Sequence, residues 1–308
     1  MAEGQAGEQS LAEQPDSEDG KFDHDTAVWL DDGPDGSPER DSDHGADRRL
    51  RFGAVVAPDW RAGRGPHGGY LAAMLLRALV EAVADATRAP RSLTIHYARA
   101  PEPGPVQITT TLERGGRSLS TLSARMHQDG RLIALALAAF SVPWGGLEIS
   151  DVQMPVVEPA DPSRDGVKLI KRGGPEFAHH IVLQPRMPGV PLSGTAQPME
   201  ILSWIGLAAP RPLDALALAF YSDALIPAPY MRVSQPVAVP TVDLTVHFHT
   251  HDARRHVPDP GALCLARTST ELVHEGFFIE DGTIWAPDGT LLAKSRQLAI
   301  VIPFAEHT

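Results

Sequence analysis

An internal repeat constrains the fold of this 308-residue chain more than any other feature of its sequence. Residues 92–97 (SLTIHY) match residues 243–248 (DLTVHF), and residues 128–134 (QDGRLIA) match residues 287–293 (PDGTLLA). In each half the two segments follow an apolar helical pattern in the same order. A unit of about 120–150 residues that occurs twice fits the usual size of a domain, so we expect two copies of one fold.

Each copy combines one helix with several antiparallel strands. Apolar residues recur at spacings of three and four over residues 68–86, and residues 213–225 show a shorter pattern of this kind. Alternation and turn signals predict strands at residues 26–30, 49–56, 92–97, 106–114, 118–128, 132–142, 176–184, 199–207, 242–249, 263–274, 276–285 and 291–302. A helix that is apolar on most faces must be enclosed, and a curved antiparallel sheet wrapped round it forms a hotdog fold.

The fold class expected from these elements is α+β, with two tandem hotdog folds fused into one double-hotdog unit. Pairing the two sheets edge to edge also removes an exposed edge. Composition sets the boundaries that we expect. Four parts follow in order: a disordered acidic tail (1–22), an N-terminal hotdog (23–144), a linker rich in Pro, Gly and Asp (145–174) and a C-terminal hotdog (175–308).

Charge and composition exclude several classes of protein. The formal net charge is −12, and Lys and Arg are not clustered, which argues against nucleic-acid partners and anionic membrane surfaces. We find no run of about eighteen apolar residues, so no membrane span is expected. The acidic start of the chain lacks the pattern of a secretory signal, and a single cysteine, Cys264, forms no internal disulfide. We therefore expect a cytoplasmic protein.

The order of short motifs resembles that of the TesB-like (type II) acyl-CoA thioesterases, a double-hotdog family. No single motif is specific, but the ordered set covers nearly everything after residue 50. The motifs are GPHGGYLAA (65–73), SLTIHYARAP (92–101), GRS (116–118), YSD (221–223), PTVDLTVHFH (240–249) and KSRQ (294–297). The resemblance implies hydrolysis of an acyl-CoA thioester and assembly as a homodimer or a larger homo-oligomer.

Asp223, Thr241 and Gln297 match the hydrolytic triad of that family. Each residue alone has a structural explanation, as a helix-end carboxylate, a strand start or an edge polar group. Their joint match on three separate elements favours function. Aligning the two halves places Pro90 opposite Thr241 and Ala138 opposite Gln297, so we expect one working site, in the second half.

The chemistry implied by the resemblance is simple. A water held by Asp223, Thr241 and Gln297 attacks the thioester, and no covalent nucleophile or cofactor is needed. Gly68 and Gly69 open the first helix, where backbone N–H groups suit a developing oxyanion. Because sites of the family lie between the two hotdogs, we expect these glycines to bind the substrate of the second-half triad.

Several other functions fit the sequence less well than thioester hydrolysis does. A non-catalytic acyl-CoA or acyl-carrier binding protein on the same scaffold stays open. A hotdog-fold hydratase needs an Asp and a His together at the start of the central helix, and neither predicted helix carries such a pair. His247, His249 and His251 alternate on one strand, but strand histidines more often fill a half-buried face than bind a metal, so we expect no metal site. Cys264 lies in an apolar strand and suits core packing, and no Gly-x-Ser-x-Gly elbow is present.

Overall fold

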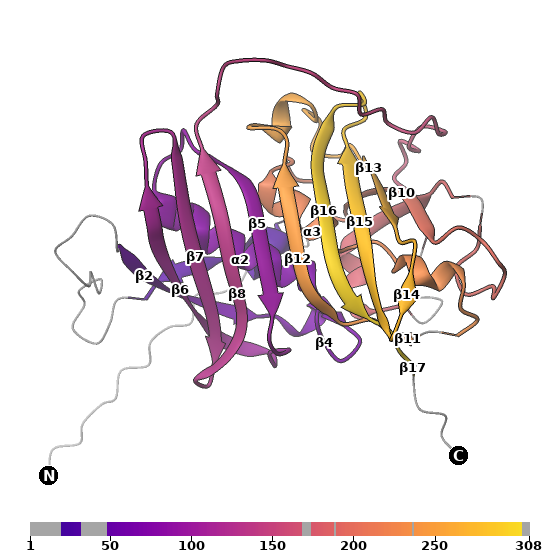
Figure 1. Ribbon diagram of the computed structural model, residues 1–308, viewed down its shortest axis with the longest axis horizontal. Helices are drawn as coiled ribbons and strands as arrows, with labels where there is room; N and C mark the ends of the chain where they lie inside the picture. Colours follow the sequence, from indigo (N-terminus) through magenta and orange to yellow (C-terminus); the bar gives the residue numbers. More distant parts are fainter. Residues whose placement is uncertain (1–19, 32–47, 168–173, 188, 236, 304–308) are drawn as a thin grey trace, which may run out of the picture.

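The computed structural model describes residues 20–31, 48–167, 174–187, 189–235 and 237–303. Residues 1–19 of the predicted tail and residues 168–173 of the predicted linker lie outside the described residues. The rest of the predicted linker, as far as residue 167, contains neither helix nor strand. It crosses from the first half to the second along one edge of the molecule (Figure 1).

One thirteen-stranded antiparallel sheet runs through both halves. The first half contributes β1 (Val28–Leu30), β2 (Arg49–Val56), β5 (Ala89–Tyr97), β6 (Gly104–Gly115), β7 (Leu119–Gln128) and β8 (Arg131–Ser141). The second contributes β9 (Ile181–Pro185), β10 (Glu200–Leu207), β12 (Thr241–Phe248), β13 (Cys264–Ser269), β14 (Val273–His274), β15 (Phe277–Trp285) and β16 (Leu291–Ile300). Two short pairs stand apart, β3 (Arg61–Ala62) with β4 (Gly65–Pro66) and β11 (Val237–Ala238) with β17 (Ile302–Pro303).

The order of strands mirrors itself about the junction of β5 and β12. Outward from β5 the order is β8, β7, β6, β2, β1, and outward from β12 it is β16, β15, β13, β10, β9. The two segments that match in sequence therefore pair with each other, and Thr94 faces Thr245 at the centre, with their Oγ1 atoms 3.1 Å apart. This is the fused double-hotdog arrangement that the repeat predicts.

The register repeats in detail across the two halves. β5 has an irregularity between Pro90 and Ser92, and β12 has one at the same place, between Thr241 and Asp243. Next to it, each strand pairs with β8 or β16 in equivalent register, as the alignment of the halves requires. A residue in one half therefore has a definite structural counterpart in the other.

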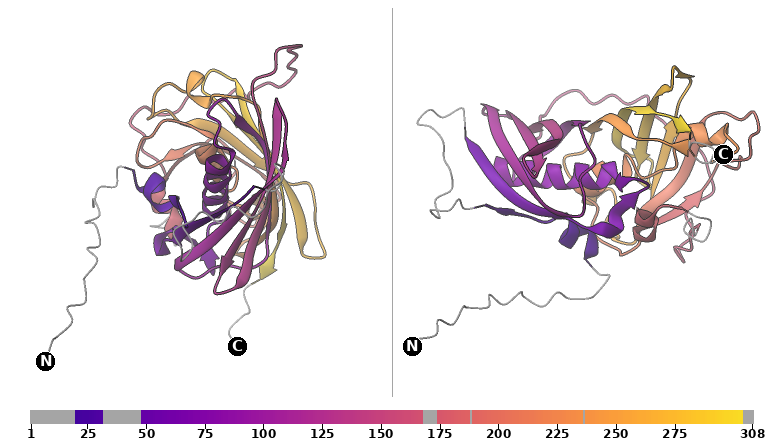
Figure 2. Two further views of the ribbon diagram at one scale, coloured as in Figure 1. Left: turned by 90° about the vertical axis from the view of Figure 1, so that its left-hand side faces the viewer. Right: turned by 90° about the horizontal axis from the view of Figure 1, so that it is seen from below.

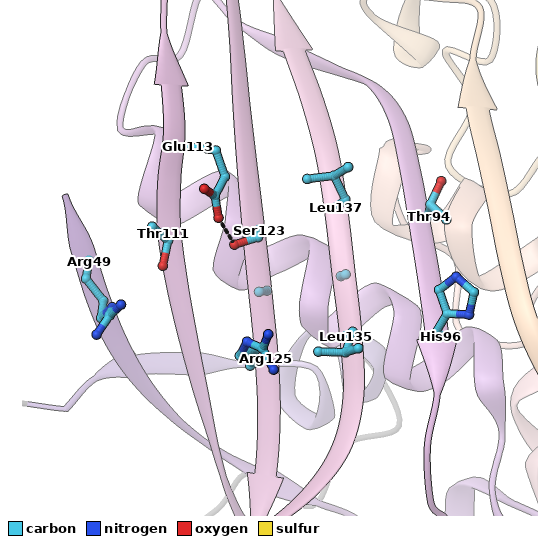
Figure 3. A pocket seen from close by; sticks show the side chains of 11 residues that line it. Arg49, Thr94, His96, Thr111, Glu113, Ser123, Arg125, Leu135 and Leu137 are labelled. Atoms are coloured by element: carbon cyan, nitrogen blue, oxygen red, sulfur yellow. Dashed lines mark hydrogen bonds between the residues drawn. The ribbon is translucent and has the colours of Figure 1, made fainter. Parts of the chain in front are cut away.

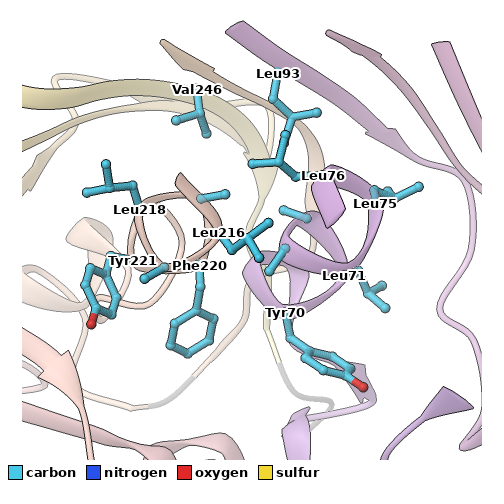
Figure 4. Close-up of a cluster of buried hydrophobic side chains, with 14 of the residues drawn as sticks. Tyr70, Leu71, Leu75, Leu76, Leu93, Leu216, Leu218, Phe220, Tyr221 and Val246 are labelled. Atoms are coloured by element: carbon cyan, nitrogen blue, oxygen red, sulfur yellow. The ribbon is translucent and has the colours of Figure 1, made fainter. Parts of the chain in front are cut away.

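Two helices lie in the hollow of the sheet. α2 (Gly68–Val83) is apolar on most faces, and the curved sheet wraps round it (Figure 2). α3 (Ala215–Tyr221) packs beside α2, and their side chains share one core (Figure 4). Leu75, Leu76 and Leu79 are fully buried there, and burying one such side chain contributes about 1.5–3 kcal/mol. No helix within the described residues is long and apolar enough to cross a membrane.

Several elements differ from the sequence-based expectations. The second helix does not cover residues 213–225, because Asp214 caps it by accepting from Ala217 N at 3.0 Å and it ends at Tyr221. Residues 176–180 form a 3-10 helix, η3 (Glu176–His180), rather than the start of a strand, since Phe177 and Ala178 turn inward. The predicted strand 263–274 is interrupted after Ser269, where the hydroxyl of Thr270 donates to Ile279 O at 2.6 Å.

Short helices complete the chain. They are α1 (Lys21–Asp25), η1 (Pro58–Trp60), η4 (Ala228–Met231) and η5 (Ala253–Arg255). α1 begins inside the predicted tail and ties its end to the core. Asp23 accepts from Arg77 and Arg211, and the buried Asp25 accepts from Trp60 Nε1 at 2.7 Å. These anchors hold residues 21–25 against the folded part of the chain, so the end of the predicted tail belongs to the N-terminal hotdog.

Candidate active site

Asp223 follows α3 by two residues and faces the start of α2 in the other half. Its Oδ2 accepts from the backbone N–H of Gly69 at 2.8 Å, and its side chain is 11% exposed. The start of a helix carries unpaired N–H groups and a partial positive charge, so it stabilises a carboxylate. The structure thus brings Gly69 to Asp223 across the junction. The N–H of Gly69 is thus already bonded to the carboxylate. The role of Gly68 and Gly69 in binding an oxyanion stays a prediction.

Close approach explains why both of these helix residues are glycines. A Cβ on Gly68 would lie 2.7 Å from Asp223 Oδ2, and a Cβ on Gly69 would lie 2.6 Å from the carbonyl oxygen of Phe220. Both distances are shorter than van der Waals contact. Glycine therefore allows the end of α3 to meet the start of α2.

We expect Gly69→Ala to lower the free energy of unfolding by about 1–3 kcal/mol, because backbone must shift to admit the methyl group. The shift would also move Asp223, so any activity at this site should fall with it. Urea unfolding measures the first effect. Gly145→Ala is the control, because a Cβ there meets nothing within 4 Å. Equal stability of the two variants would contradict the close packing.

His67 caps α2 and contacts Asp223 at the same time. Its Nδ1 accepts from Tyr70 N at 3.3 Å, and its Nε2 lies 2.9 Å from Asp223 O and 3.6 Å from Asp223 Oδ2. Burial lowers the pKa of His67. A neutral ring with its hydrogen on Nε2 fits both hydrogen bonds, so both ring nitrogens are used on backbone groups. Sequence analysis found no His–Asp pair on one helix, and the structure builds this one from both halves.

Thr241, Gln297 and Glu280 form a chain of hydrogen bonds beside Asp223. Thr241 Oγ1 donates to Gln297 Oε1 at 3.0 Å, and Gln297 Nε2 donates to Glu280 Oε1 at 2.9 Å. The other carboxylate oxygen of Glu280 accepts from Ala228 N at 2.7 Å. The Thr241 side chain also lies beside the Asp223 carboxylate. The structure therefore brings together all three residues predicted from the motifs.

Burial sets the acidity of the site. It raises the pKa of Asp223, and the nearby His67 and the Gly69 N–H partly offset this. Burial also raises the pKa of Glu280 to about 7, helped by the nearby Asp223 carboxylate. Tyr97 stays protonated, because burial raises its pKa well above its usual range, and its hydroxyl donates to Gly68 O at 2.9 Å. Two carboxyl groups thus share one enclosed site.

The first half has different residues at the positions equivalent to Thr241, Gln297 and Glu280. Gln297 pairs with Leu244 on one side and Glu280 on the other, and the equivalent positions in the first half follow from the repeated register. Three buried residues occupy the places of Thr241, Gln297 and Glu280: Pro90, Ala138 and Leu122. Apolar residues therefore fill these positions in the same fold, whereas polar groups here must be hydrogen-bonded to offset the cost of burying them.

A broad hollow lies elsewhere, on the face of the sheet away from α2 (Figure 3). Its floor is polar and charged, with Arg49, Glu113, Arg125 and His96 among the lining side chains, and Ser123 donates to Glu113 within it. None of the residues of the Asp223 site lines it. In the part of the chain that the structure describes, His, Cys, Asp and Glu form no group of three or more that could hold a metal ion.

Comparison with known proteins identifies the family. Residues 56–141 match the model of the acyl-CoA thioesterase N-terminal domain, and residues 153–301 match that of the C-terminal domain. The chain belongs to the acyl-CoA thioesterase family. Its double-hotdog fold is that of TesB-like members.

Several known proteins are similar to this thioesterase family member over most of its length. An uncharacterized protein of Mycobacterium tuberculosis is 26% identical over 285 residues, which span 85% of this chain and 94% of the relative. A hot dog fold protein from Alicyclobacillus acidocaldarius superposes with a TM-score of 0.76 at 25% identity, over 92% of this chain and 99% of the other. An acyl-CoA thioesterase II from Mycobacterium marinum, at 20% identity, shows the same fold with a TM-score of 0.64, over 84% and 94% of the two chains.

Sequence reasoning missed two side chains of the site around Asp223. Glu280 alternates in phase with Phe278 and Ile284, which are buried, so an acidic residue on the apolar face of that strand was the available signal. His67 lies in the motif before Gly68, but only the folded chain shows that it reaches Asp223. Both contacts join segments far apart in sequence.

Proposed function

We propose that this protein hydrolyses acyl-CoA thioesters with a water molecule held by Asp223, Thr241 and Gln297. One observation carries the proposal. A connected polar cluster, in which Gln297 and Glu280 are buried and Thr241 is half-buried, occupies the second half at positions where the first half has buried apolar residues. Membership of the acyl-CoA thioesterase family supports the class of substrate.

Asp223 would act as the general base in this reaction. The oxygen of the water attacks the carbonyl carbon of the thioester while its proton passes to the Asp223 carboxylate. The carbon–sulfur bond then breaks, the thiolate leaves and takes up a proton, and the products are a carboxylic acid and CoA. Burial raises the pKa of Asp223, which makes the carboxylate a better base near neutral pH.

The alternative of a hydratase finds less support. His67 and Asp223 do lie together at the start of α2, but both ring nitrogens of His67 are occupied by backbone partners. The ring is also almost fully buried. A general acid–base histidine needs a free nitrogen within reach of its substrate. His67 is better suited to holding α2 and the Asp223 backbone in place.

The test is release of CoA from a panel of acyl-CoAs of short to long chain, followed with a thiol reagent. Hydrolysis of one or more members is the expected result, and the preferred member gives the chain length. A protein that binds a thioether analogue but hydrolyses no member of the panel would instead be an acyl-CoA binding protein, the alternative that the sequence leaves open.

A further inference from the structure

Glu280 is a buried carboxyl group for which the proposed reaction has no role. It lies directly opposite Gln297 in the ladder of β15 and β16, and it is 4% exposed. Each of its carboxylate oxygens accepts one N–H group, from Gln297 Nε2 and from Ala228 N. Its hydrogen bond to Gln297 connects Glu280 to Thr241, because the same amide accepts from the Thr241 hydroxyl.

The amide of Gln297 has a donor end and an acceptor end, and Glu280 selects between them. An ionised carboxylate only accepts hydrogen bonds, so the Nε2 of Gln297 must face it. The Oε1 then faces Thr241, and the Thr241 hydroxyl donates its hydrogen to that oxygen. The Thr241 oxygen is left as an acceptor beside Asp223.

We propose that Glu280 is a positioning residue that orients the Gln297 amide and, through it, the hydroxyl of Thr241. The proposal rests on the proposed function, because its purpose is to hold the attacking water. With Glu280 ionised, Asp223 and Thr241 both accept, and together they bind both hydrogens of one water. The lone pair of that water is then free to attack the thioester.

Protonation of Glu280 would reverse the direction of each hydrogen bond from Glu280 through Gln297 to Thr241. A protonated carboxyl group donates to Gln297 Oε1, the amide turns over, and Nε2 now donates to Thr241. The Thr241 hydroxyl hydrogen is released toward Asp223, where it occupies the base and removes one of the two acceptors for water. The protonated form should therefore be the slow form.

The ionisation of Glu280 is expected close to neutral pH. Burial, and then the charge of Asp223, raises the pKa of Glu280 to about 7 against the hydrogen bonds from Ala228 and Gln297. His67, on the other side of Asp223, stays neutral because burial lowers its pKa. An acid of this pKa is about one-tenth ionised at pH 6 and about nine-tenths at pH 8. The kcat of the wild type should rise about tenfold between these two values.

Glu280→Gln tests the proposal. In this variant the amide oxygen of residue 280 accepts from Ala228 N, so its NH₂ group must face Gln297. The NH₂ group donates to Gln297 Oε1 at every pH, which keeps the Gln297 amide in the orientation expected for protonated Glu280. We expect kcat at pH 8 to fall about tenfold or more, with KM within about twofold, and the rise between pH 6 and pH 8 to disappear. Asp281→Asn is the matched control, since Asp281 is exposed and bonded to Arg296. It should keep the wild-type profile.

A second readout needs no activity. The ¹⁵N–¹H signals of the Gln297 side-chain amide, identified by their loss in Gln297→Ala, should shift with a midpoint near pH 7 in the wild type and stay fixed in Glu280→Gln. A folded Glu280→Gln with the wild-type kcat and profile would overturn the proposal, as would amide signals insensitive to pH. If the wild type hydrolyses no acyl-CoA, the proposed function fails, and these signals still decide whether Glu280 orients Gln297.

Discussion

Replacing Asp223 with Asn is expected to lower kcat for the preferred acyl-CoA by at least about 100-fold, the scale of a positioned general base. The amide keeps an oxygen that accepts from Gly69 N, so the junction of α2 and α3 should stay closed. It cannot accept the proton of the attacking water. The loss should therefore appear in kcat, with the affinity for a thioether analogue retained.

Two measurements keep this prediction sharp. Urea unfolding shows whether the variant is folded, and we expect no large loss, because a buried charge is removed while its hydrogen bond survives. Asp281→Asn removes an exposed carboxylate from the same sheet and should leave kcat unchanged. A folded Asp223→Asn with wild-type kcat would show that the water is activated by another group.

The second large effect is expected when the polar residues of the cluster are replaced by apolar residues like those of the first half. The triple variant Thr241→Val, Glu280→Leu, Gln297→Ala should lose activity by at least about 100-fold, since Thr241 and Gln297 no longer hold water. It should nevertheless fold. Leu122 and Ala138 already fill the equivalent places, and both are 1% exposed.

Stability distinguishes the triple variant from its parts. Glu280→Leu alone leaves both the Nε2 of Gln297 and the backbone N–H of Ala228 buried without an acceptor, and each unpaired donor costs about 1–3 kcal/mol. Removing Gln297 as well removes its unpaired Nε2, while the Ala228 N–H is unpaired in both variants, so the triple variant should be more stable than Glu280→Leu. Urea unfolding of both variants measures the difference. A triple variant that loses the sum of the single effects would mean that the cluster is needed for folding.

The fold was largely predictable because short segments of the sequence reveal the repeat. The segments that begin at Ser92 and Asp243 align without a gap, and the structure pairs them at Thr94 and Thr245. The Asp129-Gly130 signal also predicts the hairpin of β7 and β8, where both residues adopt positive φ. Apolar periodicity located α2 within a few residues.

Only the site residues that lie in the family motifs were predictable from the sequence. Asp223, Thr241 and Gln297 follow from the order of motifs, and the structure brings them together. The partner of Gln297 does not, because Glu280 becomes a neighbour only through the pairing of β15 with β16. The end of the second helix was also missed, since the apolar pattern continues through Ala224 and Leu225 while the backbone turns away to place Asp223 against α2.

One measurement tests the central claim, that Asp223 activates a water molecule, most directly. It is a single turnover of the preferred acyl-CoA with excess protein in ¹⁸O-labelled water, followed by mass spectrometry of the released acid and of the protein. The account predicts CoA release, one ¹⁸O atom in the acid and no acyl group on the protein. An acid without the label, an acyl group on Asp223, or no release of acid from any acyl-CoA would contradict it.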